Sequence, residues 1–285
     1  MKTSYLLRLW LVTTLTAGAF LPQSVAHTGI PARETLAGSA IAARREAAKP
    51  TVKNAIVTLE TPEPATATVT TKDGGIHPLH ARAIAEVESL LPAVCASRPR
   101  NVFVRYDKPE KRGLGGKTSV IVSGNLPLPE FRAVLVHEML GHVNDLGCLE
   151  GTPKSGASAF RDGNEVIFND DPSVVFYSIS WASATERKKG GRDEDFVSGY
   201  ARADAFEDAA ETIAFTVLHR EEFKRRAQGN PVLSQKLAWV ETYALPSAQS
   251  YALSTYVWDP REIPWDITML PYVWIGPAKA VAKNF

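Results

Sequence analysis

The 285-residue sequence lacks an excess of charge of either sign and has only two cysteines. Its 32 Lys and Arg side chains nearly balance its 31 Asp and Glu side chains, which leaves a net charge of +1. Because phosphate binding needs a basic surplus or stripe, this balance argues against a nucleic-acid partner. Two cysteines are too few for a fold held together mainly by disulfides. The apolar share of 45% and the charged share of 22% are instead typical of a folded globular protein.

The sequence also lacks an apolar run long enough to span a membrane as a helix. Its apolar run near the N-terminus, Trp10–Leu21, is short and follows the basic residues Lys2 and Arg8. Small residues come soon after it, at Ser24–Ala26, where a signal peptidase would read them. This pattern predicts a cleavable signal peptide over residues 1–26. We therefore expect a secreted or periplasmic protein with no stable membrane insertion after cleavage.

Export would allow the two cysteines to form a disulfide with each other. In an oxidising compartment Cys95 and Cys148 would form one disulfide that closes a loop of about 50 residues. Two buried free thiols are the alternative, because the sequence does not show whether the two Cβ atoms meet.

The remaining chain divides by composition at about residue 75. Residues 27–75 are rich in Ala, Thr and Pro, and they predict a largely disordered linker or pro-segment. From residue 76 to 285 the sequence predicts one folded domain. The glycines at 113, 115 and 116 predict a hairpin turn, since no Lys-Ser/Thr pair opens a helix after them as a phosphate loop would require. Apolar periodicity predicts helices over 78–94, 130–146 and 205–226 and strands over 101–106, 117–123 and 165–168.

The motif with the clearest chemistry is His137-Glu138-Met-Leu-Gly141-His142, on the expected helix 130–146. Histidine nitrogens bind zinc, and an adjacent Glu can take a proton from a water on the metal. The usual zinc-peptidase helix carries H-E-x-x-H, whereas this sequence has one extra residue. In a regular α-helix, positions five apart differ by about 140°, so His137 and His142 would not converge on one ion.

A π-bulge would restore the convergence of the two histidines. It adds one residue to a turn, and such bulges are frequent at functional sites. Gly141 lies inside this turn and would let the backbone take the irregular geometry at low steric cost. The sequence therefore predicts a π-bulge between His137 and His142.

The H-E-x-x-G-H pattern resembles the zinc helix of the dipeptidyl peptidase III family, which also carries E-E-x-x-A-E on a later helix. This chain has Phe206-Glu207-Asp-Ala-Ala-Glu211, in which Phe206 replaces the first Glu of that motif. Glu-x-x-x-Glu also matches the wider gluzincin clan, and some secreted gluzincins have a Tyr seven residues earlier, where Tyr200 stands. The resemblance is carried by these two short motifs.

The resemblance implies an α+β, zincin-like metallopeptidase domain in which a small sheet packs on the zinc helix and the C-terminal part is helical. It implies that Zn²⁺ is held by His137, His142 and Glu207, and that Glu211 orients a ligand histidine. Physical chemistry supports the Glu pair independently, because residues four apart share a helix face and one can bind metal while the other accepts a hydrogen bond from the ligand. We expect Glu138 to be the general base and Tyr200 to stabilise the oxyanion.

Other residues with ligand chemistry are expected to be structural. His77, His80 and His219 are read as packing or surface residues, and His219 is twelve residues beyond Glu207. Asp145, three residues after His142, is either an acid that supports the site or a plain helix-end residue, and the sequence favours the latter. The strand before the zinc helix is either an edge to which a peptide adds or an internal strand.

The sequence thus predicts a secreted zinc metallopeptidase that acts on a peptide or protein. Two other classes stay open. One is a secreted zinc-binding or interaction protein that has lost catalysis, and the other is a zinc amide hydrolase that acts on cell-wall material.

Overall fold

The computed structural model describes residues 56–58, 68–70, 75–95, 101–107, 111–246, 249–259 and 261–277. All of them belong to one unit that spans residues 44–285. The predicted signal peptide, and most of the predicted linker or pro-segment 27–75, lie outside the described residues.

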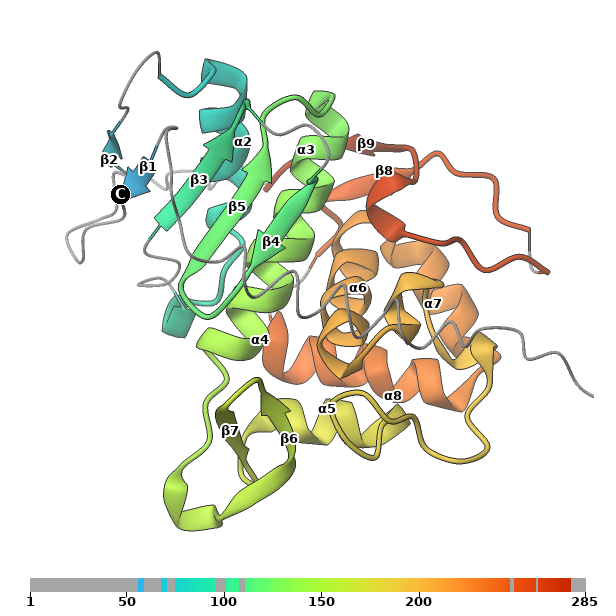
Figure 1. The fold of residues 1–285 in the computed structure, drawn as a ribbon. Coiled ribbons are helices and arrows are strands. Elements are labelled where there is room, and N and C mark those ends of the chain that lie inside the picture. The colour runs from blue at the N-terminus through green and yellow to red at the C-terminus, as the bar shows by residue number, and fades with distance from the viewer. Residues whose placement is uncertain are drawn as a thin grey trace, which may run out of the picture. The chain divides into compact units, whose positions relative to one another are not determined.

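A five-stranded sheet forms one layer of this unit, with strand order β2-β1-β3-β5-β4 (Figure 1). β3 and β5 are parallel, and the other neighbouring pairs are antiparallel. Valines occupy every second position of β3 and β5, and all four are buried, as expected for a sheet with one face on the core. The strands are β1 (Ile56–Thr58), β2 (Thr68–Thr70), β3 (Asn101–Arg105), β4 (Gly113–Gly115) and β5 (Ser119–Ser123).

The sheet corrects two expectations and settles a third. β1 and β2 fall inside segment 27–75, so the sheet begins before residue 76. The glycine-rich segment expected to be a turn is strand β4, and the chain turns after it to reach β5. The strand before the helix that carries the two histidines is β5. It is internal, whereas β4 lies at an edge of the sheet. Two glycines in a three-residue strand hide its pattern, because glycine carries no side chain to alternate.

The helix that carries the two histidines runs beside this sheet from Leu128 to Gly147, and we call it the site helix. It begins as α3 (Leu128–Leu135), continues as a π-helical segment (Val136–Val143) and ends as α4 (Asn144–Gly147). The predicted helix over 130–146 is therefore confirmed, as is the π-bulge between the histidines.

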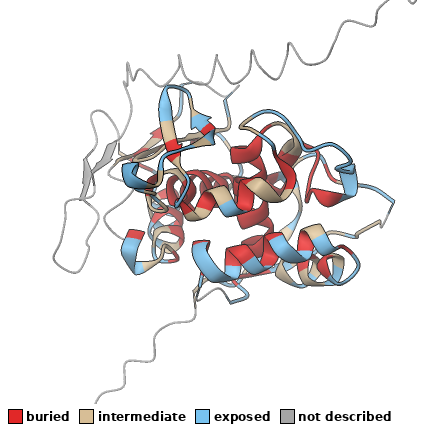
Figure 2. Cartoon of the chain, turned by 90° about the horizontal axis from the view of Figure 1, so that it is seen from below, coloured by how far each residue is buried: buried red, intermediate tan, exposed pale blue. Residues whose placement is uncertain are grey.

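Four further helices build the C-terminal part of the unit, and α6 is the central one (Figure 1). All fourteen residues of α6 are buried, and buried residues gather in the middle of the unit in Figure 2. The helix expected over 205–226 is divided at His219, whose backbone leaves the helical region at φ −139° and ψ 39°. These helices are α5 (Pro172–Ser180), α6 (Ala205–Leu218), α7 (Arg220–Gln228) and α8 (Pro231–Trp239), which continues as a π-helical turn over Val240–Ala244.

A helix that is buried on all sides must satisfy its polar groups internally. Asp208 of α6 does so through Lys236 of α8, whose Nζ lies 2.7 Å from one carboxylate oxygen and 2.9 Å from the other. The indole of Trp181 donates to the same carboxylate at 2.9 Å. This pair therefore ties α6 to α8 within the core.

The remaining elements are small. α2 (Pro78–Glu88) packs on α3 and is shorter than the helix expected over 78–94. The antiparallel hairpins are β6 (Ala157–Asp162) with β7 (Glu165–Phe168), and β8 (Ala252–Ser254) with β9 (Tyr272–Trp274). No helix in the described part of the chain has the length and apolar character to cross a membrane. The 3₁₀ segments are Ala93–Cys95, Pro153–Ser155, Asp193–Asp195, Tyr200–Arg202 and Ile267–Met269.

Cys95 and Cys148 form a disulfide, with their Cα atoms 5.3 Å apart. The bond joins the segment after α2 to the residue that ends the site helix. The disulfide predicted from the sequence is therefore confirmed, and it anchors the end of the helix that carries both histidines.

Replacing both Cys95 and Cys148 by Ser should lower the free energy of unfolding by about 2–4 kcal/mol, because the bond closes a long loop in the unfolded chain. Urea unfolding of the oxidised protein and the double variant measures the difference. Reduced and alkylated wild type should shift equally. Equal stability of all three forms would show that the bond does not constrain the chain.

Candidate metal centre

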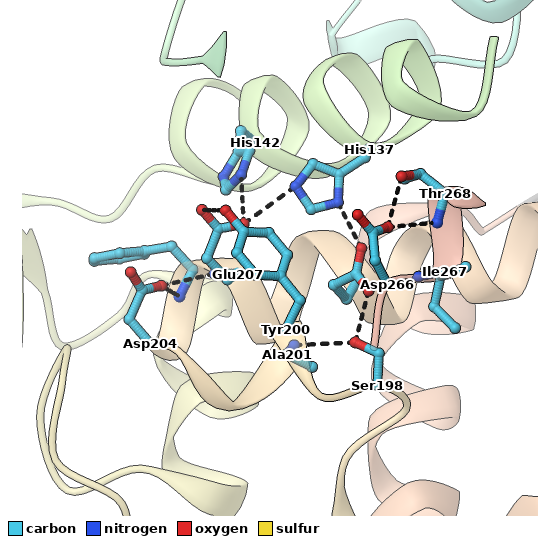
Figure 3. Close-up of polar contacts among 12 residues, drawn as sticks. His137, His142, Ser198, Tyr200, Ala201, Asp204, Glu207, Asp266, Ile267 and Thr268 are labelled. Atoms are coloured by element: carbon cyan, nitrogen blue, oxygen red, sulfur yellow. Dashed lines mark hydrogen bonds and ion pairs between the residues drawn. The ribbon is translucent and has the colours of Figure 1, made fainter. Parts of the chain in front are cut away.

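The π-helical segment places His137 and His142 on one side of the site helix, facing α6 (Figure 3). Their ring centroids are 5.0 Å apart and the rings are nearly perpendicular, at 74°. Both side chains are buried. The extra residue between them therefore does not prevent the two rings from approaching one point.

Glu207 faces both rings from the first turn of α6. Asp204 caps this helix, and its carboxylate accepts from the backbone N–H groups of Phe206 at 2.9 Å and Glu207 at 2.7 Å. Such a cap fixes where the helix begins and thus where its first side chains point. Glu207 is therefore held by the start of its own helix.

One oxygen of Glu207 lies close to both histidines. Its Oε2 is 3.1 Å from His137 Nε2 and 3.3 Å from His142 Nε2. Ligand atoms bound at about 2.0–2.1 Å to a tetrahedral zinc ion lie roughly 3.3 Å apart. Both distances from Glu207 Oε2 are close to this separation, and the chemistry of the three side chains, two imidazoles and one carboxylate, fits zinc.

Glu211, one turn beyond Glu207, holds the other nitrogen of His137. Its Oε1 is 2.9 Å from His137 Nδ1, and its Oε2 accepts from the Ser198 hydroxyl at 2.6 Å and from the Ile267 backbone N–H at 3.0 Å. Glu211 is completely buried, so these contacts replace its hydration. It therefore orients His137, as predicted.

This contact also decides which nitrogen of His137 faces Glu207. With the Nδ1 proton donated to Glu211, a neutral imidazole presents a lone pair at Nε2. The Glu207 carboxylate oxygen opposite it is also an acceptor. Two acceptors 3.1 Å apart are unfavourable unless a cation lies between them or the ring is doubly protonated. The arrangement thus has a place for a positive charge at the point where the ligand atoms meet.

Glu138 lies on the side of the site helix that faces the edge strand β4. A Cβ atom at Gly113 would lie 2.5 Å from Glu138 Oε1, and one at Gly115 would lie 2.8 Å from Glu138 Oε2. The strand passes so close to the Glu138 carboxylate that neither position has room for a side chain, and glycine is therefore needed at both. Ligand atoms of His137, Glu138 and His142 lie within 4.8 Å of one another, so Glu138 reaches the neighbourhood of the metal position. Glu138 and Glu207 are therefore both candidates for a third ligand, and one oxygen of Glu207 is close to both rings.

Tyr200 completes the group of predicted site residues. Its hydroxyl donates to Glu207 Oε1 at 3.0 Å, and its ring lies 6.0 Å from that of His137. The side chain is half-exposed, whereas Glu207 is buried. The structure thus brings all six predicted site residues together, with Tyr200 on the solvent side.

Gly141 has a different role from the one expected. Its backbone is not in the left-handed region that favours glycine. Instead, a Cβ atom there would lie 2.7 Å from the Cβ atom of Ala210 on α6. Gly141 therefore allows the site helix and α6 to approach closely, as the contact between His137 and the two glutamates requires.

Sequence reasoning missed the residues that support the site. The cap Asp204 had a local signal, because Asp commonly precedes the first turn of a helix. Ser198, Ile267 and the two glycines of β4 had none, since each meets the site only through the fold.

The other histidines are structural, as expected. His77 caps α2 by accepting from the Leu79 N–H, and His80 stacks on the ring of Phe131. His219 packs against aromatic rings, and burial lowers its pKa to about 4. It is buried and neutral at physiological pH, and it ends α6 rather than lying on it.

Comparison of the chain with protein-family models, curated proteins and solved structures finds no match. The chemistry of the site therefore rests on the residues of this chain.

Replacing Glu207 by Ala should abolish high-affinity zinc binding, because it removes the carboxylate nearest to both imidazoles. Replacing Glu211 by Gln should weaken zinc binding by about 10–100-fold, since only the orientation and basicity of His137 change. Competition with a chromogenic chelator measures both affinities. Equal zinc affinity in wild type and Glu207→Ala would exclude Glu207 as a ligand.

Proposed function

We propose that this protein is a zinc-dependent peptidase, with His137, His142 and Glu207 as zinc ligands. The observation that carries this proposal is the position of Glu207 Oε2, at 3.1 and 3.3 Å from the two histidine Nε2 atoms. A structural zinc site would have four protein ligands, whereas a catalytic one keeps a position open for water or substrate. Three ligands with a fourth acidic side chain beside them favour a catalytic site.

The side chains then have distinct tasks. A zinc ion at this position would polarise a water molecule and the carbonyl group of the substrate. Glu138 would accept a proton from that water and later deliver it to the leaving amine. Tyr200 has a half-exposed hydroxyl at the site, and we assign it to hydrogen-bond the oxyanion that develops on the substrate. Glu211 would act only through His137, by fixing its orientation.

The edge strand β4 supports a peptide as the substrate. Within the described residues β4 pairs only with β5, so its other edge offers backbone N–H and C=O groups. An extended peptide can add to such an edge as a further strand. Because Gly113 and Gly115 lie directly over Glu138, a peptide on this edge would pass close to the general base.

An exposed indole next to Tyr200 provides a second substrate contact. Trp265 is 64% exposed, and its ring centroid lies 6.5 Å from that of Tyr200. The backbone of Trp265 is fixed, since its carbonyl accepts from the Tyr200 N–H at 2.7 Å. We assign Trp265 to pack against an apolar part of the substrate.

We further propose that the protein is exported. The signal-like segment 1–26 motivates this assignment. The disulfide between Cys95 and Cys148 supports it, because such bonds persist in oxidising compartments.

Replacing Glu138 by Gln should reduce hydrolysis by about 10²–10⁴-fold while zinc stays bound, because only the proton acceptor is lost. The measurement is turnover of a quenched fluorescent peptide library by zinc-loaded protein, with zinc content determined by elemental analysis. Glu241→Gln is the matched control, since Glu241 is an exposed residue of the π-helical turn Val240–Ala244 that follows α8. It should retain wild-type turnover.

Each contrary result has a definite meaning. Equal turnover in wild type and Glu138→Gln would contradict the role of Glu138. Bound zinc without hydrolysis of any peptide would favour a zinc-binding or interaction protein. Hydrolysis of cell-wall amides in place of peptides would favour the amide-hydrolase class.

A further inference from the structure

A second acidic site lies beyond the C-terminal end of the site helix. A cavity of about 230 Å³ is bounded there by α4, the β6–β7 hairpin and α5. Five carboxylates line it but only one basic group, that of Lys117. Lys117 is already paired with Glu165, at 2.6 Å. The cavity therefore has a surplus of negative charge.

Asp145 is the buried acid of this cavity. Its side chain is 1% exposed, and its Oδ2 accepts from the Tyr177 hydroxyl at 2.5 Å. No donor in the described part of the chain hydrogen-bonds its Oδ1. An unsatisfied buried carboxylate oxygen is costly, and a cationic donor in the cavity would remove that cost. From the sequence, a helix-end residue is favoured at this position over an acid that supports the histidine site.

The electrostatics around Asp145 favour the same kind of ligand. Burial, with smaller contributions from the nearby Asp171 and Asp162, raises the pKa of Asp145 to about 7 against the opposing effect of the Ser173 and Tyr177 hydroxyls. A bound cation would favour the ionised carboxylate.

The shape and lining of the cavity favour an organic cation over a metal ion. In the described residues, the one group of three metal-binding side chains with ligand atoms within 4.8 Å is His137, Glu138 and His142. No three of the cavity's described carboxylates have oxygens within 4.8 Å of one another, so in this arrangement they do not surround a calcium ion at about 2.3–2.6 Å. Apolar walls from Leu146, Ile167 and Phe168 would instead cover the aliphatic part of a long cationic side chain.

The cavity also lies at the end of the proposed peptide-binding edge. Gly115, the last residue of β4, is over Glu138, and Lys117 in the cavity wall is two residues further along the chain. Lys117 lies in the turn between β4 and β5, so two residues of chain separate it from Gly115 by at most about 7 Å. A peptide on β4 would therefore bring a side chain to the cavity a few residues from the bond over Glu138.

We propose that this cavity binds the side chain of an arginine or lysine residue of the peptide substrate, with Asp145 as its partner. The inference rests on the proposed function and adds a substrate class to it. Guanidinium is the better fit, because its planar donors can reach Asp145 Oδ1 and a second carboxylate of the cavity together.

The test compares two fluorogenic peptide libraries, one with arginine and one with uncharged citrulline at each position in turn. Zinc-loaded wild type should cleave the arginine library about 10–100-fold faster at one position relative to the cleaved bond. In Asp145→Asn this ratio should fall toward one. Asp259→Asn removes a carboxylate whose hydrogen bonds, among the described residues, all come from nearby Arg261, and it should keep the wild-type ratio. Zinc content and thermal unfolding of each variant check the fold.

A binding measurement separates this inference from the proposed function. Calorimetry with Nα-acetyl-arginine methylamide should detect binding to Glu138→Gln, and none after Asp145→Asn is added. If Asp145→Asn does not fold, Asp162→Asn, at the rim of the same cavity, should lower the ratio partly.

Cleavage with equal rates for both libraries, and no binding of the arginine probe, would overturn the inference and leave the peptidase intact. No cleavage of either library by zinc-loaded wild type would overturn the proposed function and the substrate assignment with it. Calcium that stabilises wild type but not Asp145→Asn, with no effect of the arginine probe, would overturn the inference in favour of a metal site.

Discussion

The close contact between Gly141 of the site helix and Ala210 of α6 sets the geometry of the whole centre. With no side chain at Gly141, the two helices approach until His137 reaches Glu207 with one nitrogen and Glu211 with the other. A larger residue would push the helices apart and separate the imidazoles from the carboxylates at once. The disulfide anchors the end of the site helix, and the Asp208–Lys236 ion pair ties α6 to α8.

The grouping of the two histidines with Glu207 and Glu211 was predictable because its information is local. His137 and His142 are five residues apart, which implies a π-turn if both bind the same metal ion. Glu207 and Glu211 are four residues apart, which places them on one helix face. The supporting residues were not predictable, because their spacing in the sequence is large. Ile267 meets Glu211 fifty-six residues away, and only the folded chain brings its N–H to the carboxylate. The edge strand was misread for a related reason, since Gly113 and Gly115 give no alternating pattern.

The C-terminal segment contributes to the centre through a second link. Arg112, just before β4, is bonded to Glu130 at 2.7 Å and to Asp266 at 2.6 Å, and it donates to the Thr268 hydroxyl at 2.9 Å. This half-buried arginine thus joins the edge strand, the start of the site helix and the segment that supplies the Ile267 N–H. The pairing with two carboxylates raises the pKa of its guanidinium against the effect of burial, so it remains charged. The position of the edge strand and the support of Glu211 are therefore coupled.

The sequence is nearly neutral in net charge, but its buried charged residues are mostly acidic. Among the described residues eight acids are buried, while Lys236 is the one buried Lys or Arg. Lys236 neutralises Asp208, and helix caps or local partners account for Asp171, Asp195 and Asp204. The remaining four acids lie on or against the site helix, around the two imidazoles and in the cavity beyond it: Glu138, Asp145, Glu207 and Glu211. Buried carboxylates without fixed counter-charges are costly, so a cation at each place would lower the free energy of the folded state. The two cations that we propose for these places are a zinc ion between the imidazoles and Glu207 and a basic side chain on Asp145.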